Sequence, residues 1–87
     1  MMENQLHLMY ENPLNPAEVL IRHFITWRAL TSFVWDNEIK TLQVKNDSGD
    51  TIVSIRMFKQ GISERERFEI KYYSDHHVPQ SLLSIFS

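Results

Sequence analysis

The chain has 87 residues, of which 43% are hydrophobic and 23% charged, and this balance is typical of a globular domain rather than a disordered segment. It contains no cysteine, which excludes disulfides, zinc–thiolate sites and a cysteine nucleophile. The formal net charge of −2 excludes a global positive field that would attract nucleic acid. We therefore expect residues 1–87 to form one small globular domain.

The first predicted element is a short strand over residues 5–10. Its apolar residues alternate with others and so share one side of the strand: Leu6, Leu8 and Tyr10. Residues 11–16 follow as a connector, because two prolines prevent a continuous element through this segment.

A long amphipathic helix is predicted over residues 16–34. Asn15 suits the N-cap, Pro16 suits the first helical position, and Glu18 lies three residues after the cap, as in a capping box. The predicted buried stripe repeats at helical spacing: Leu20, Phe24, Trp27, Thr31 and Val34.

An antiparallel meander is predicted after the helix, with three strands over residues 39–45, 51–59 and 64–73. A bulge near Lys40 and Thr41 is expected in the first of them, because the apolar residues on its two sides are out of phase. The polar segment 46–50 predicts a hairpin loop. The apolar tail after Pro79 predicts one or two helical turns.

Together these elements predict an α+β fold in which one long amphipathic helix packs on a small antiparallel sheet, in the order β-α-β-β-β-α. Alternation along the last two strands places their apolar residues on the helix side of the sheet. The opposite, outer face then carries five basic residues against one acid, Glu69. The five are Lys45, Arg56, Arg65, Arg67 and Lys71.

The basic outer face has two interpretations. It could bind nucleic acid or another anionic partner, with Phe58 and Tyr73 available for stacking. It could equally be a solvated antiparallel face, in which Arg56 pairs with Glu69 across two strands.

A second unusual feature is the apolar surface at the end of the predicted helix and in the C-terminal tail. This surface includes Phe33, Trp35, Leu83 and Phe86, and it exceeds what one small sheet requires. These four residues are candidates for a protein-binding or dimer interface. The alternative is that the tail and the first strand cover the helix end as part of the core.

Candidate chemistry is sparse. The segment Asp75-His76-His77 is the one local cluster of metal-ligand types, but adjacent histidines in a strand or turn point to different sides. The chain has two glycines and no Gly-rich phosphate loop, and no carboxylate lies on an apolar background that would raise its pKa. We therefore expect no catalytic residues, no cofactor and no metal site.

The sequence favours a small non-enzymatic protein-binding module. Such a module could act as a regulator or inhibitor by occluding a partner protein, and it could derive from a phage or a mobile element. The alternative is a nucleic-acid-binding module that uses the basic outer face. A homodimer is compatible with either interpretation, because small domains often gain stability by self-association.

We expect a cytoplasmic location and no membrane partner. The first five residues lack the basic and apolar regions of a signal peptide. The longest mostly apolar stretch, residues 19–35, is interrupted by Arg22, His23 and Arg28.

Overall fold

A computed structural model describes residues 5–62, 65–73 and 77–87 of the chain. In this described part, five strands form one antiparallel sheet, with two short helices and a final 3₁₀ turn. The strands are β1 (Leu6–Asn12), β2 (Asn15–Phe24), β3 (Leu42–Lys45), β4 (Thr51–Gln60) and β5 (Arg65–Tyr72). The helical elements are α1 (Trp27–Asp36), α2 (Gln80–Leu83) and η1 (Ser84–Phe86).

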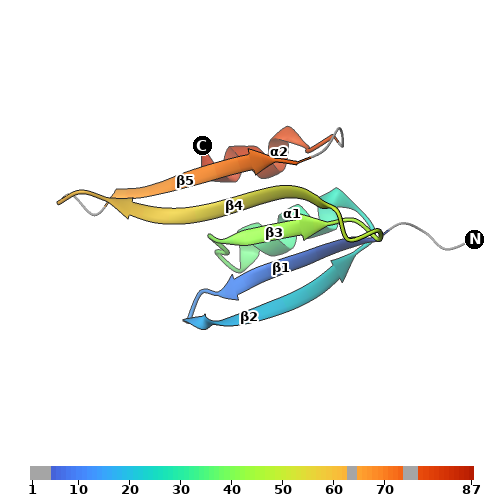
Figure 1. Ribbon diagram of the computed structural model, residues 1–87, viewed down its shortest axis with the longest axis horizontal. Helices are drawn as coiled ribbons and strands as arrows, with labels where there is room; N and C mark the ends of the chain where they lie inside the picture. The colour runs from blue at the N-terminus through green and yellow to red at the C-terminus, as the bar shows by residue number, and fades with distance from the viewer. Residues whose placement is uncertain (1–4, 63–64, 74–76) are drawn as a thin grey trace, which may run out of the picture.

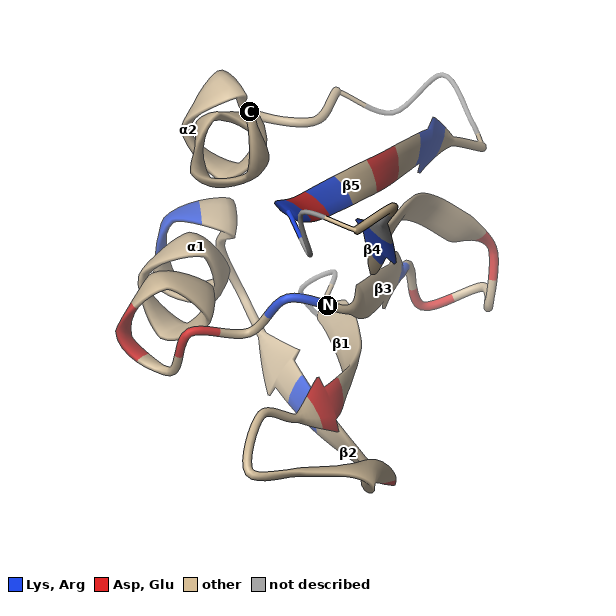
Figure 2. Ribbon diagram, turned by 90° about the vertical axis from the view of Figure 1, so that its left-hand side faces the viewer, with Lys and Arg blue, Asp and Glu red and all other residues tan. Residues whose placement is uncertain are grey.

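The spatial order of the strands is β2-β1-β3-β4-β5, and every neighbouring pair is antiparallel (Figure 1). Both helices lie on the same side of the sheet, so one face is covered and the other is open (Figure 2). The prediction of an α+β fold with an antiparallel sheet is therefore confirmed.

The prediction of one long helix over residues 16–34 is wrong, and with it the order β-α-β-β-β-α. Residues 15–24 form strand β2, and the helix that follows is ten residues long. A tight turn explains the change, because the Asn12 side chain accepts a hydrogen bond from the Leu14 amide at 3.0 Å and reverses the chain. Strand β2 then pairs with β1 from Asn15 to Phe24.

Helix α1 begins at a cap that the sequence analysis did not identify. The Thr26 hydroxyl accepts a hydrogen bond from the Ala29 amide at 3.2 Å, and Thr26 has the extended backbone of an N-cap residue. The helix buries Leu30 and Val34 against the sheet. It ends at Asp36, beyond the predicted end at Val34, and Asn37 caps it through bonds to the Phe33 carbonyl.

Strand β3 begins at Leu42, so the predicted start at Ile39 is wrong. Ile39 lies in the connector, where its amide donates to the Val34 carbonyl at 3.1 Å and its side chain is buried. The irregularity in pairing lies between Val44 and Lys45 rather than near Lys40 and Thr41.

Strand β1 runs to Asn12, two residues beyond its predicted end, and β2 begins at Asn15, so the predicted connector over residues 11–16 is reduced to Pro13 and Leu14. Strands β4 and β5 match the predicted strands over 51–59 and 64–73 to within one residue, with residue 64 outside the described residues. The 46–50 loop and the helical turns of the tail agree with the prediction.

The core fills the layer between the covered face of the sheet, α1 and the C-terminal segment. Alternate residues of the strands point into it, together with residues of both helices and of η1. The central members are Leu8, Tyr10, Leu30, Val34, Leu42, Val44, Val53, Ile55, Leu82 and Phe86.

Strands β4 and β5 continue beyond the start of β3 as a two-stranded arm (Figure 1). The first residue of β3, Leu42, pairs with Ile55 of β4, whereas β4 and β5 stay paired as far as Gln60 and Arg65. One side of this arm faces the C-terminal segment through the Phe68 and Phe86 rings, whose centroids are 5.1 Å apart.

Candidate functional site

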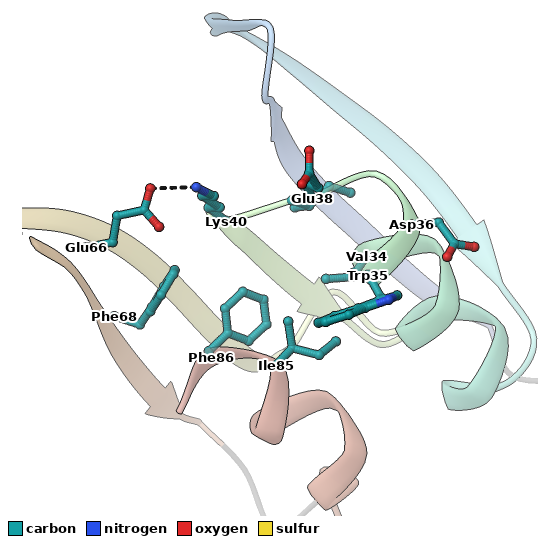
Figure 3. A pocket seen from close by; sticks show the side chains of 10 residues that line it. Val34, Trp35, Asp36, Glu38, Lys40, Glu66, Phe68, Ile85 and Phe86 are labelled. Carbon is teal, nitrogen blue, oxygen red and sulfur yellow. Dashed lines mark hydrogen bonds and ion pairs between the residues drawn. The ribbon is translucent and has the colours of Figure 1, made fainter.

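A cleft lies between the end of α1, the connector to β3, the arm and η1. Its volume is about 510 Å³. Figure 3 shows Trp35, Ile85 and Phe86 around one opening, with Phe68 of β5 beside them. We call this hollow the Trp35 cleft.

The exposure of Trp35 follows from its place on α1. Val34 is fully buried against the sheet, and each residue of an α-helix is rotated by roughly 100° from the one before it. Trp35 is therefore turned away from the sheet, and 65% of its surface is exposed. Its indole forms an apolar wall of the cleft that the C-terminal segment does not cover.

The polar lining of the Trp35 cleft is mainly acidic. Asp36, Glu38 and Glu66 supply three carboxylates against the single ammonium of Lys40. Lys40 Nζ and Glu66 Oε1 form an ion pair at 2.5 Å, which ties the connector to the arm (Figure 3). No ion pair links Asp36 or Glu38 to any described residue, so the cleft combines apolar walls with surplus negative charge.

The four predicted protein-binding residues do not form one surface. Phe33 faces Tyr10 and Phe24 with ring centroids 5.5 and 5.3 Å away, and it lies beneath the Arg22 guanidinium. Phe86 is 7% exposed and belongs to the core, as one edge of the cleft.

The other two members of that set also differ from each other. Leu83 is half-buried and packs on the core from α2. Trp35 alone keeps a large exposed apolar surface. Core membership therefore accounts for most of the apolar surplus that the sequence suggested, and the candidate interface is the cleft beside Trp35.

The basic outer face carries the five predicted bases, but strand β1 adds Glu11 to it as a second acid in addition to Glu69. Register places Lys45, Arg56, Arg65, Arg67 and Lys71 on the face opposite the helices. They are spread along the sheet rather than clustered, from Lys45 beside the 46–50 loop to Arg65 near the tip of the arm. The acid Glu69 lies opposite Arg56 in register and contacts Lys71 at 3.3 Å.

Four of those bases remain without an ion pair to any described residue: Lys45, Arg56, Arg65 and Arg67. Arg67 lies opposite Phe58 on the arm, so an exposed ring and a guanidinium are neighbours there. This arrangement could contact a phosphate backbone and a base, although Glu69 on the same face reduces the local field.

A polar cluster that the sequence did not reveal lies on the same face, at the 46–50 loop. His7 Nε2 and Asp47 Oδ1 are 2.7 Å apart, and the His23 ring meets the His7 ring edge-on at 4.6 Å. The hydrogen bond with His7, and then the one from the Gln5 amide, lower the pKa of Asp47. His23 could not be placed here from sequence because it was assigned to a helix.

No group of three metal-ligating side chains was found among the described residues. In the predicted cluster, Asp75 and His76 lie outside the described residues, and His77 is exposed.

The chain matches no family model, no curated protein and no solved structure. No helix in the described part is long and apolar enough to cross a membrane.

Proposed function

We propose that this chain is a protein-binding module that holds a short segment of a partner protein in the Trp35 cleft. The observation that carries the proposal is the 65% exposed indole of Trp35 beside an apolar opening. Tryptophan is among the residues that contribute most to protein interfaces when a partner covers it. By covering this segment, the module would block its contacts with other proteins and so act as a regulator or inhibitor.

The size of the cleft supports a side-chain anchor rather than a flat contact. Its volume of about 510 Å³ lies within the range of pockets that enclose a ligand group. Phe68, Ile85 and Phe86 give it apolar walls, so an aliphatic or aromatic side chain of the partner would lose its water there.

The charge of the lining indicates what should flank that anchor. Asp36 and Glu38 carry negative charge at the cleft without an ion pair to any described residue. A lysine or arginine next to the anchor in the partner would complement them, whereas an acidic neighbour would be repelled. The proposed ligand is therefore a short segment with one large apolar residue beside a basic residue.

Affinity capture from nuclease-treated lysate, followed by quantitative mass spectrometry, tests this proposal. The wild-type chain is compared with Trp35→Ala and with Tyr73→Ala, which removes an exposed aromatic residue outside the cleft. We expect a set of proteins that Trp35→Ala loses and Tyr73→Ala retains. Equal recovery by all three chains would contradict the proposal.

Nucleic-acid binding by the outer face is the second candidate function. It is favoured by the three arginines without ion pairs to described residues and by the exposed Phe58 opposite Arg67. Three phosphate contacts would give a slope of about −2.7 in a plot of log affinity against log salt for a duplex.

Three arginine-to-glutamate variants test nucleic-acid binding, and they make the same change of charge on different surfaces. Arg56→Glu and Arg67→Glu should weaken binding and reduce the slope, whereas Arg28→Glu makes the same charge change on α1 and should leave both unchanged. Binding that is undetectable at low salt, or that all three variants weaken equally, would rule this function out.

A further inference from the structure

Strand β2 lies at one edge of the sheet and has a neighbour on one side only, β1 (Figure 1). The pattern of hydrogen bonds shows which of its main-chain groups are free. The Glu11 amide donates to the Thr41 carbonyl, so the main-chain groups of Glu11 point toward β3. In an antiparallel sheet these groups alternate in direction along a strand, so those of Met9 and His7 also point toward β3. The residues between them, Leu8 and Tyr10, bond to β2.

The same alternation applies to β2. Leu20 and Arg22 lie opposite Tyr10 and Leu8, so their amides and carbonyls bond to β1. Val19, Ile21 and His23 therefore direct theirs outward, and no described element occupies that edge.

This free edge has little of the protection that edge strands usually have. Such strands commonly carry lysines, central prolines or bulges that prevent pairing with another chain. In β2 the proline is the second residue, Pro16, and the strand contains no lysine. Val19 and Ile21 are 56% and 59% exposed, so the open edge is flanked by apolar side chains.

We propose that this edge is the interface of a homodimer, in which β2 pairs antiparallel with β2 of a second copy. The two-fold axis passes between Leu20 and Leu20 of the second copy. Val19 then lies opposite Ile21 of the other chain, and their outward main-chain groups exchange hydrogen bonds on both sides of the axis. Two five-stranded sheets become one continuous sheet, with the helices of both copies on the same face.

Charge selects this register over its neighbours. With Leu20 on the axis, Glu18 lies opposite Arg22 of the second copy, and symmetry repeats that pair. An axis at Arg22 would oppose two arginines, and an axis at Ile21 would leave Glu18 opposite Phe24. Within one copy, Glu18 accepts a hydrogen bond from Asn12 and Arg22 covers the Phe33 ring. Neither residue has an ion pair to a described residue of its own chain, so both charges are available to the second copy.

The dimer would leave the Trp35 cleft open, because no β2 residue lines that cleft. Each dimer would display two clefts, and a partner carrying two suitable segments would bind by avidity. The dimer does not depend on the proposed function, since its evidence lies at the opposite edge of the sheet.

Charge reversal with rescue tests the interface. Glu18→Arg places arginine opposite arginine twice, and Arg22→Glu places glutamate opposite glutamate twice. Each single variant should dimerise at least about tenfold more weakly than the wild type. An equal mixture of the two variants restores both opposite-charge pairs and should dimerise like the wild type.

Analytical ultracentrifugation over a dilution series measures these states, with Glu69→Arg on β5 as the matched control that should remain dimeric. A wild-type chain that stays monomeric up to its solubility limit would overturn the proposal. Single variants as dimeric as the wild type, or a mixture that stays monomeric, would also overturn it.

A cysteine scan tests the register, since the chain has no cysteine of its own. Leu20→Cys places two thiols across the axis at a non-hydrogen-bonded pair, where the Cα separation of roughly 4.5 Å fits a disulfide. Ile21→Cys lies opposite Val19 and should cross-link poorly. Efficient oxidation of Ile21→Cys without that of Leu20→Cys would contradict the register.

Discussion

Replacing Phe86 with alanine tests whether the C-terminal segment belongs to the core or to an interface. Phe86 is 7% exposed, and its ring lies 5.1 Å from that of Phe68 at an angle of 64°. Removing a buried phenylalanine costs about 3–5 kcal/mol, through lost burial and the cavity that remains. Small domains have a free energy of unfolding of roughly 5–15 kcal/mol, so this loss would be a large share of the total.

Trp35→Ala is the matched comparison at the same cleft. About a third of the Trp35 surface is covered, roughly 80 Å², and at 25 cal/mol/Å² its loss costs at most about 2 kcal/mol. Urea unfolding followed by far-ultraviolet circular dichroism measures both variants without relying on tryptophan fluorescence. With a slope of about 1 kcal/mol/M, the midpoint should fall by several molar for Phe86→Ala and by at most about 2 M for Trp35→Ala.

A small loss of unfolding free energy for Phe86→Ala would show that the C-terminal segment is not part of the core. If its unfolding free energy fell by less than about 1 kcal/mol, the C-terminal segment would not be packed as described. If Trp35→Ala were the more damaging variant, the indole would be a core residue and the proposed cleft would lose its exposed anchor.

Three further predictions concern local features. Thr26→Ala removes the N-cap of α1 and should lower the free energy of unfolding by about 1 kcal/mol, whereas Asn15→Ala should not show a helix-cap loss, because Asn15 lies in a strand. Gly49 has φ +85°, so Gly49→Ala should cost about 1 kcal/mol in the same urea assay. The hydrogen bond with His7 lowers the pKa of Asp47 in the folded chain. The contribution of Asp47 to the free energy of unfolding is therefore present above its ordinary pKa of 3.8, and it is lost as pH falls through the lowered pKa of the folded chain. The stability difference between wild type and Asp47→Asn should therefore shrink in acid, and a difference that grew below pH 3.8 would contradict the assignment.

The last two strands could be predicted from sequence because one period dominates them. Ile55 and Ile70 point inward, while Arg56 and Glu69 point outward, so alternation alone defines their faces. The basic outer face followed directly from this pattern. Its lack of clustering did not, because position along the sheet depends on how each strand is paired.

The segment 15–24 could not be predicted correctly because it fits two periods at once. Leu20 and Phe24 match helical spacing, yet they also face inward as alternate residues of a strand. Apolar Val19 and Ile21 on the opposite side hide the alternation. The deciding interaction is the pairing with β1, which is tertiary and has no local signal beyond the turn after Asn12.

For the candidate sites too, the sequence identified the residue types but not their positions in the fold. That Trp35 belongs to an apolar cluster was evident from sequence, but its exposure depends on which side of α1 meets the sheet. The His7, His23 and Asp47 cluster joins three elements that are distant in the chain. The open edge of β2 could not be foreseen while that segment was assigned to a helix.

Selection from a displayed peptide library tests whether the Trp35 cleft binds a short segment of a partner. Peptides are selected on the wild-type chain after depletion on Trp35→Ala, and their affinities for both chains are then measured. We expect peptides with one large apolar residue next to lysine or arginine, which bind the variant at least about tenfold more weakly. Peptides that bind both chains equally, or that carry acidic residues beside the anchor, would contradict the proposal.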